Sequence, residues 1–189
     1  MINVAVFASG EGTNAENLFK HFAGDTRVRF KLVVTNNDEA GIIARAEHYK
    51  KNIHIISKTA LENYTQQIIE FLKLEQIDLI VLAGFLLKIP QSMVAAFPNK
   101  IINIHPSLLP KFGGKGMYGM HVHRAVVAAG EKESGITIHF VDEEYDHGTY
   151  ILQAKCSVEP NDTAESLRAK IAALEMEYFP KAIETLLEK

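Results

Sequence analysis

Apolar and polar positions alternate in blocks along the first half of the chain. Five apolar blocks, rich in β-branched residues, have the length of strands and lie at residues 3–8, 30–35, 53–56, 79–82 and 101–104. Apolar residues at helical spacing separate these blocks, at residues 15–22, 42–49, 61–74 and 91–97. Strands that alternate with helices in this way form a parallel sheet with helices on both faces. The first half of the sequence therefore predicts an α/β fold.

The pattern changes after Pro110. A loop with four glycines at residues 111–120, which suggests a mobile flap, precedes a helical stretch at residues 122–129. Two strands follow, at residues 135–141 and 150–158, and a hairpin can pair them antiparallel. The whole pattern predicts a Rossmann-like three-layer sandwich, with a mostly parallel sheet and an antiparallel strand pair near the C-terminus.

A long helix is expected at the C-terminal end of the chain. Asp162, with Glu165 three residues later, has the spacing of a capping box. One face of this helix then carries apolar residues, namely Leu167, Ile171, Leu174 and Tyr178. Pro180 lies in the same stretch and is expected to kink or break the helix.

Size and charge limit the classes of partner. With 189 residues, 47% of them hydrophobic, the chain is long enough for one core, so we expect residues 1–189 to form a single domain. A net charge of −3 leaves no basic field that would attract nucleic acid. The apolar residues 1–8 are too short to span a membrane and have no basic leader region, so we expect a cytoplasmic protein without a membrane partner.

Cysteine and histidine usage bears on redox chemistry and metal binding. The single cysteine, Cys156, excludes an intramolecular disulfide and a zinc site built from several cysteines. Its neighbours have the pattern of a strand, which favours an inert core thiol over a nucleophile. Four histidines are possible metal ligands by residue type, namely His105, His121, His123 and His139. Without cysteines nearby, this set does not predict a metal site.

A loop with two glycines joins the first strand to the first helix. In the run Ser9-Gly10-Glu11-Gly12-Thr13-Asn14 the glycines let the backbone turn tightly, and free amides at the helix start can receive an anion. The last three residues of the run, Gly12, Thr13 and Asn14, are therefore candidates for holding a phosphate.

The same loop also fits a dinucleotide-binding turn, through the spacing Gly10-x-Gly12-x-x-Ala15. Such a turn expects an acidic residue at the end of the second strand, where it holds the ribose hydroxyls. Here that strand ends in Thr35-Asn36-Asn37, and Asp38 comes later than expected. The sequence therefore favours phosphate binding and leaves the dinucleotide alternative open.

The fifth strand runs directly into Asn103-Ile104-His105-Pro106. Ligands bind at the carboxyl edge of open α/β sheets, where this segment is expected. In an extended strand Asn103 and His105 point the same way and can converge on one atom, while Ile104 packs into the core. Both are candidates for catalysis, although a histidine before a proline also occurs as a hydrogen-bonded structural residue.

Four segments together resemble a known family. They are Ser9-Gly10-x-Gly12-Thr13-Asn14, Val81-Leu-Ala-Gly-Phe85, Asn103-Ile-His105-Pro106-Ser107-Leu-Leu-Pro110, and His139-Phe-Val141 with Asp146-x-Gly148 before Ile151-Leu-Gln153. Their order along essentially the whole chain is similar to that of the folate-dependent formyltransferase family. The phosphate loop, and the expected absence of a further domain, are similar to the branch of the family that formylates glycinamide ribonucleotide.

The resemblance implies an enzyme of purine biosynthesis that transfers the formyl group of 10-formyltetrahydrofolate, its cosubstrate, to the amine of 5-phosphoribosylglycinamide. It also implies that Asn103, His105 and Asp146 are catalytic. An amine that attacks a formyl carbon produces an oxyanion, to which Asn103 and a protonated His105 can donate hydrogen bonds. The Asp146 carboxylate would favour the imidazolium and take the proton of the amine. Without the resemblance, Asp146 also fits a solvated acidic turn.

The resemblance further implies the substrate contacts. Gly12, Thr13 and Asn14 would hold the ribonucleotide phosphate. Pro106 would border the glycinamide arm, and Glu175 would bind the ribose hydroxyls, although Glu175 also fits a solvated helix charge. The folate would lie between two segments, with contacts from Phe85, Leu86, Leu87, Ile89, Asn103, Val141, Asp142 and Asp146.

The sequence departs from the family in three places. Leu61 and Leu87 stand where relatives commonly have arginines, so contacts to the glutamate tail of the folate are not predicted, and Lys88 is the available substitute. The loop at residues 111–120 is longer than is usual in relatives. Its two lysines, Lys111 and Lys115, fit solvated loop positions better than substrate ligands.

Two other kinds of function stay open. A formyltransferase with another acceptor, or a hydrolase that releases formate, would use the same chemistry. A nucleotide-binding module without catalysis is disfavoured, because Asn103, His105 and Asp146 are all present. The expected partners are small-molecule substrates, and the sequence leaves open whether the chain is a monomer or a homodimer.

Overall fold

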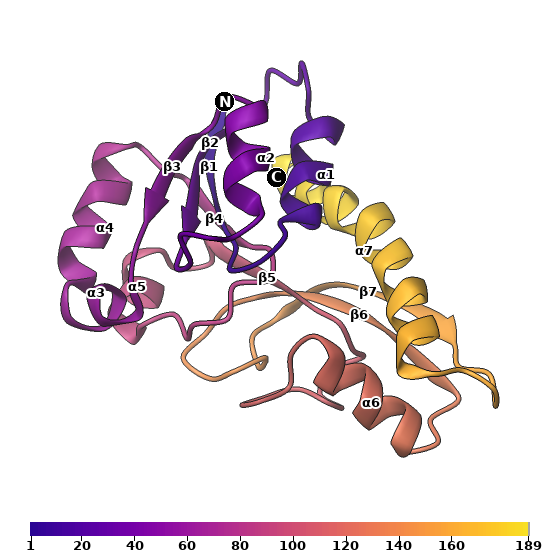
Figure 1. Cartoon of the computed structure of the whole chain (residues 1–189). Coiled ribbons are helices and arrows are strands. Elements are labelled where there is room, and N and C mark those ends of the chain that lie inside the picture. The colour runs from indigo at the N-terminus through magenta and orange to yellow at the C-terminus, as the bar shows by residue number, and fades with distance from the viewer. Residues whose placement is uncertain (189) are drawn as a thin grey trace. The chain divides into compact units, whose positions relative to one another are not determined.

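The computed structural model describes residues 1–188, in which strands and helices alternate (Figure 1). The strands are β1 (Ile2–Phe7), β2 (Val28–Thr35), β3 (Asn52–Ile55), β4 (Leu79–Leu82), β5 (Ile101–His105), β6 (Glu133–Phe140) and β7 (Tyr150–Ser157). The helices are α1 (Thr13–His21), α2 (Ile42–His48), α3 (Lys58–Asn63), α4 (Thr65–Leu74), α5 (Gln91–Ala96), α6 (Met120–Ala128) and α7 (Ala164–Leu187).

The strands hydrogen-bond in the order β3-β2-β1-β4-β5-β6-β7. β1 pairs in parallel with β2 and β4, and β2 pairs in parallel with β3. β6 and β7 pair antiparallel, with Glu133 opposite Ser157. The predicted fold class, a mostly parallel sheet with an antiparallel pair near the C-terminus, is confirmed.

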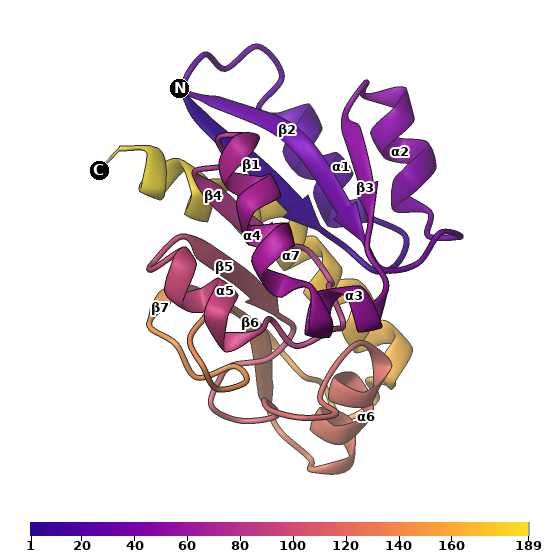
Figure 2. The ribbon, with the colours of Figure 1, turned by 90° about the vertical axis from the view of Figure 1, so that its left-hand side faces the viewer.

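The described chain forms two compact units, residues 1–102 with residues 187–188, and residues 103–186. In the first unit, α1 and α2 lie on one face of the strands while α3 and α4 lie on the other (Figures 1 and 2). Its centre is β1, where the side chains from Val4 to Phe7 are fully buried. Over residues 1–188, none of the helices has both the length and the apolar character that a membrane crossing requires.

One predicted helix is two helices in the structure. The stretch at residues 61–74 is divided at Tyr64, whose φ of −123° lies outside the helical range. α3 begins earlier than predicted because the Ser57 side chain accepts a hydrogen bond from the Ala60 amide at 3.0 Å and caps it. The apolar periodicity was continuous, so only the cap and the backbone break reveal the division.

The N-terminal cap of α7 also differs from the prediction by one residue. Thr163 Oγ1 accepts from the Ser166 amide at 3.2 Å, and Ser166 Oγ accepts from the Thr163 amide at 2.9 Å. This reciprocal pair is the capping box, in place of Asp162 with Glu165. Asp162 instead accepts from Lys170 Nζ, from the Ser166 hydroxyl and from the Glu159 amide, and these hydrogen bonds, the one from Lys170 most of all, lower the pKa of Asp162 to about 2.

Pro180 does not break α7, so of the two outcomes expected, a kink or a break, the break is wrong. The helix continues to Leu187, and Pro180 itself is buried. A proline removes one backbone donor, but the apolar face continues on both sides of it through Phe179, Ala182 and Ile183, all fully buried. Burial of this face keeps the helix together across the missing hydrogen bond.

The cap of α7 provides a first test. Thr163→Ala removes the hydroxyl that accepts from the Ser166 amide, so the free energy of unfolding should fall by about 1 kcal/mol. Chemical denaturation measures this change. Thr59→Ala, at an exposed position within α3, is the matched control. An equal loss in both variants would contradict the capping role.

Candidate active site

Ser9 hydrogen-bonds across three loops of the first unit, those that follow β1, β2 and β4. Its hydroxyl donates to Asn36 Oδ1 at 2.5 Å, just after β2, and accepts from the Leu86 amide at 2.9 Å, after β4. Its own amide donates to the Gly84 carbonyl at 3.0 Å. Sequence reasoning gave Ser9 no role beyond the loop, because its partners lie 27 and 77 residues away.

Gly12 is required for two separate reasons. Its φ of 73° lies in the left-handed region, where a side chain is strained, and it caps the N-terminus of α1. A Cβ at this position would also collide with the Ile42 side chain. Thr13 follows as the first residue of α1 and is exposed, and Asn14 is half-buried. The predicted phosphate loop therefore has the glycine turn and the helix start that anion binding needs.

The predicted folate segment after β4 has a buried base and an exposed tip. Phe85 and Ile89 are 9% and 5% exposed, whereas Leu86 is 56% exposed and Leu87 is half-buried. Phe85 packs edge-on against Phe7, with 5.3 Å between ring centroids. The segment is thus anchored by its aromatic ring, and it presents an apolar side chain to solvent.

In the second unit, four polar side chains converge. Asn103 and His105 lie on β5, His139 lies on β6, and Asp146 follows β6. Asp146 Oδ2 is 3.4 Å from His105 Nδ1, and Asp146 Oδ1 is 3.4 Å from Asn103 Nδ2. The structure therefore brings together the three predicted catalytic residues.

His139 is the member of this cluster to which sequence reasoning gave no catalytic role. It is 1% exposed, and its Nδ1 donates to the Phe140 carbonyl at 2.8 Å. A proton on Nδ1 leaves Nε2 to accept from Asn103 Nδ2, which lies 3.2 Å away. His139 and Asp146 thus orient the Asn103 amide. A signal was present, because His139 belongs to the fourth matching segment, but nothing local showed that it would face Asn103.

The backbone around Asp146 adopts an unusual conformation that fixes the position of the carboxylate. Asp146 adopts φ 56°, a left-handed conformation that non-glycine residues rarely take. Two residues later, a Cβ on Gly148 would collide with the Phe140 carbonyl oxygen, so only glycine fits. Residues held in strained backbone conformations cluster at functional sites.

A buried hydrogen-bond network holds the segment that follows His105. The Thr137 hydroxyl donates to the Ser107 carbonyl at 2.7 Å and accepts from the Leu109 amide at 3.0 Å. Gln153 Nε2 donates to the same hydroxyl at 2.9 Å and to the Leu109 carbonyl at 3.1 Å. Ser107 and Thr137 are fully buried. β6 and β7 therefore fix the chain where it leaves the cluster.

The cluster perturbs the protonation of its members. Burial lowers the pKa of the His105 imidazole, and the charge of Asp146 offsets only part of that effect. For Asp146, burial acts in the opposite direction, but the neighbouring His139 and His105 rings and the Gly114 amide outweigh it and hold its pKa below the usual value. These directions pair an ionised Asp146 with a neutral His105 at neutral pH in the absence of substrate.

The other predicted residues of the second unit are half-buried: Pro106, Val141, Asp142 and Glu175. Asp142 accepts from His147 Nδ1 at 2.9 Å. The pKa of the Cys156 thiol is raised by burial, as an inert thiol requires.

Two of the histidines considered as metal ligands differ in exposure. His121 is exposed, while His123 is 4% exposed and burial lowers its pKa. Within residues 1–188, no group of three or more His, Cys, Asp or Glu side chains is arranged to hold a metal ion.

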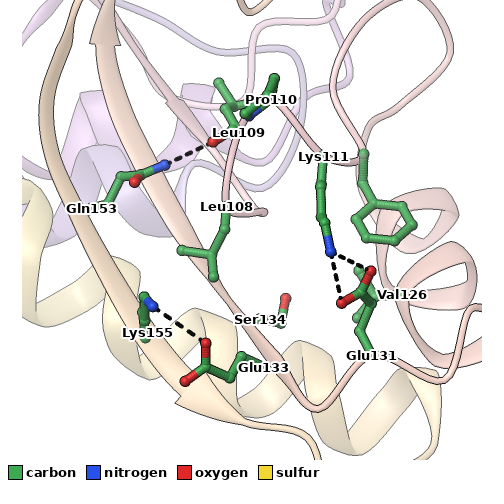
Figure 3. Close-up of a pocket in the computed structure, with 11 residues that line it drawn as sticks. Leu108, Leu109, Pro110, Lys111, Val126, Glu131, Glu133, Ser134, Gln153 and Lys155 are labelled. Carbon is green, nitrogen blue, oxygen red and sulfur yellow. Dashed lines mark hydrogen bonds and ion pairs between the residues drawn. The ribbon is translucent and has the colours of Figure 1, made fainter.

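A cavity of about 310 Å³ lies against the segment after His105, without the catalytic candidates among its lining residues (Figure 3). Leu108, Leu109 and Val126 line it with apolar groups. Two ion pairs lie at this cavity, Lys111 with Glu131 at 2.8 Å and Lys155 with Glu133 at 3.2 Å (Figure 3).

Comparison with known proteins identifies the family that shares these features. A family model described as formyl transferase matches residues 2–183. A phosphoribosylglycinamide formyltransferase of Bacillus subtilis is 37% identical over 191 residues, which cover 99% of this chain and 95% of that protein. The crystal structure of the Bacillus halodurans phosphoribosylglycinamide formyltransferase superposes with a TM-score of 0.90 at 36% identity, covering 99% of this chain and 96% of that one.

A plant relative is longer than this chain. The chloroplastic phosphoribosylglycinamide formyltransferase of Vigna unguiculata is 39% identical over 190 residues, which cover 98% of this chain. The chain spans 61% of the length of that protein. The similarity thus extends across nearly all of the chain, but across only part of this relative.

Proposed function

Because this chain belongs to the formyl transferase family, we propose that it transfers the formyl group of 10-formyltetrahydrofolate to the amine of 5-phosphoribosylglycinamide in purine biosynthesis. The observation that carries the proposal is the convergence of Asn103, His105 and Asp146 in the second unit. These groups supply an amide donor, a titratable imidazole and a carboxylate, which are the groups that transfer of a formyl group between two nitrogens requires.

The first step forms a bond from the acceptor nitrogen to the formyl carbon, and the electron pair of the C=O bond moves onto oxygen. The Asn103 N–H that makes the longer contact, 3.4 Å to Asp146 Oδ1, is the one available to donate to this oxyanion, while the other N–H remains hydrogen-bonded to His139 Nε2. The orientation of the amide is set beforehand, because His139 Nε2 and Asp146 Oδ1 both lie within 3.4 Å of Asn103 Nδ2. A donor that is fixed before the charge develops costs no reorganisation in the transition state.

The second step moves a proton and breaks the bond to the folate. The attacking nitrogen loses a proton and N10 of the folate gains one as the C–N10 bond breaks, so one group that accepts and returns a proton is sufficient. We assign this transfer to His105 instead of the Asp146 carboxylate, to which the resemblance gave it, because the pKa of Asp146 is held below its usual value and a neutral imidazole is the stronger base. Asp146 stabilises the imidazolium form, since its charge acts to raise the pKa of His105. No covalent enzyme intermediate is needed, because the amine is itself the nucleophile.

A direct assay tests the reaction class and the acceptor together. Purified protein is mixed with a 10-formyl folate analogue and 5-phosphoribosylglycinamide, and the folate absorbance is followed. We expect an absorbance change that requires both compounds. A change without the ribonucleotide would indicate a formyl-folate hydrolase. No change under either condition would overturn the proposal.

The remaining substrate contacts belong to the same proposal. The ribonucleotide is assigned to Gly12, Thr13, Asn14, Pro106 and Glu175. The folate is assigned to Phe85, Leu86, Leu87, Ile89, Asn103, Val141, Asp142 and Asp146, with no metal ion taking part. The proposed location is the cytoplasm.

The phosphate loop is tested at Thr13, because Gly12 is needed for the fold itself. Thr13→Val keeps the size of the side chain and removes its hydroxyl. Loss of one hydrogen bond to a charged group should raise KM for the ribonucleotide about tenfold, while KM for the folate stays the same. Steady-state kinetics measure both, and Thr59→Val, at an exposed position in α3, is the control. An unchanged ribonucleotide KM would contradict the assignment of Thr13.

A further inference from the structure

We propose that the backbone at residues 112–114 is a positioning element that sets the tautomer of His105 and stabilises the ionised carboxylate of Asp146. This inference rests on the proposed function, in which the two side chains manage the transferred proton. It concerns a segment that lies between the catalytic strand β5 and helix α6, and whose side chains take no part in the steps above.

Two backbone groups of this segment hold the two side chains. The Phe112 carbonyl oxygen lies 2.8 Å from His105 Nε2. The Gly114 amide donates to Asp146 Oδ2 at 2.9 Å. The same Asp146 Oδ2 lies 3.4 Å from His105 Nδ1. The segment therefore engages one atom of each side chain, and the pair is held between two backbone groups that stand two residues apart.

These contacts select one tautomer of His105. A carbonyl oxygen only accepts, so a separation of 2.8 Å requires the proton on Nε2. The alternative, with the proton on Nδ1, would leave two lone pairs facing each other at that distance. At Nδ1 the nearest carboxylate oxygen is 3.4 Å away, which an unprotonated nitrogen tolerates. Nδ1, beside Asp146, is thus the nitrogen that gains and loses the proton during the reaction.

The segment is built so that it can reach both side chains. Gly113 lies close to both neighbours: a Cβ there would lie 2.5 Å from Leu109 Cδ2 and 3.3 Å from Asp146 Cβ, so a side chain must displace the buried Leu109 side chain and press against Asp146. Phe112 adopts φ 54°, a strained conformation for a residue with a side chain. The Ser107 hydroxyl donates to the Lys111 carbonyl at 2.7 Å and anchors the start of the segment.

The electrostatic effects of the segment have opposite signs on the two groups. The Phe112 carbonyl acts to raise the pKa of His105, and the Gly114 amide acts to lower the pKa of Asp146. The other titratable groups that act on the pair are His139 from β6 and His123 from α6. Displacing the segment should therefore lower the pKa of His105 and raise the pKa of Asp146. A general loss of packing would instead reduce the burial of both groups, and this would shift each pKa in the opposite direction.

The experiment follows both groups in the full chain by NMR, without substrate. The ¹⁵N shifts of the His105 ring and the ¹³C shift of the Asp146 carboxyl are recorded against pH. In the wild type we expect a neutral ring protonated at Nε2, with Nδ1 titrating. In Gly113→Ala, weakening of one hydrogen bond at each group should lower the pKa of His105 and raise that of Asp146, each by about half to one unit.

Gly116→Ala is the matched control, because Gly116 lies in the same loop with no atom near the position of the added Cβ. It strains the loop through its φ of 87° without touching the pair, so both pKa values should stay at their wild-type values. Equal shifts in both variants, or no shift in Gly113→Ala, would overturn the proposal. If the neutral His105 ring of the wild type carries its proton on Nδ1, the proposal is overturned even when Gly113→Ala fails to fold.

Kinetics separate this inference from the proposed function. The formyl-transfer rate falls at acid pH as His105 becomes protonated. In Gly113→Ala this fall is expected at a lower pH than in the wild type, displaced by the same shift in pKa that NMR reports for His105. A wild type without formyl transfer, but with the expected tautomer and shifts, would reject the proposed function and keep the positioning role. Formyl transfer with an unchanged pH profile in Gly113→Ala would reject the positioning role alone.

Discussion

Replacing Asn103 by alanine is expected to lower the turnover number by about 10²- to 10³-fold, with much smaller changes in KM for either substrate. The amide N–H acts on charge that exists only in the transition state, so its loss appears in turnover and not in substrate binding. The resting structure already aims this amide through His139 Nε2 at 3.2 Å and Asp146 Oδ1 at 3.4 Å. Steady-state kinetics with both substrates varied measure the effect.

Asn52→Ala is the matched control for this variant. Asn52 is exposed at the start of β3 and has no part in the proposed chemistry. Its turnover should equal that of the wild type. Circular dichroism establishes that both variants are folded. A folded Asn103→Ala protein with near-normal turnover would refute the role of Asn103 in stabilising the oxyanion.

Asp146→Asn should lower turnover by about 10²- to 10⁴-fold, the range associated with a positioned acid–base group. The amide keeps the shape of the carboxyl but removes the charge that stabilises a protonated His105. The pH profile changes in a defined direction. Neutral His105 is the form that accepts the proton, so the rate falls as the pH drops through the pKa of His105. Without the carboxylate that pKa is lower, and the acidic limb moves to lower pH.

The control for the second prediction lies in the same loop. Glu143→Gln makes the same change of charge at an exposed carboxylate, and its turnover and pH profile should match those of the wild type. Rates across the pH range, with the same substrates for all three proteins, isolate the effect of His105 from any titration of the substrates. An acidic limb that stays in place in Asp146→Asn would contradict the coupling between these two side chains.

Much of the site followed from the local order of residues. Asn103 and His105 are two positions apart in a strand, and the two-residue repeat of a strand directs both to one side. Gly12 was predicted because a strand-to-helix turn needs a backbone conformation that other residues avoid, and its φ is 73°. Asp146 was a different case. Its neighbours read as a solvated acidic turn, and only the resemblance to a family placed it with Asn103 and His105.

Other features depended on contacts that apolar periodicity does not contain. The early start of α3 at Ser57 and the shift of the α7 cap to Thr163 follow from individual side-chain hydrogen bonds to the backbone, three residues apart. Pro180 was expected to kink or break α7, but the helix does not break, because its neighbours on both sides are buried. At Pro180, tertiary packing outweighed a local preference.

The sequence by itself determined the α/β class, the order of the strands along the chain and the placement of Asn103 and His105 on one side of a strand, because these depend on spacing of two to four residues. Asp146 followed only from the ordered motifs that resemble a family. The tertiary structure alone decided the charge states and the proton positions. His105 is neutral at rest because burial outweighs the charge of Asp146. Its tautomer depends on the Phe112 carbonyl, and the orientation of Asn103 depends on His139, 36 residues away. Burial and long-range hydrogen bonds exist only once the chain has folded, and they set the energies on which the chemistry depends.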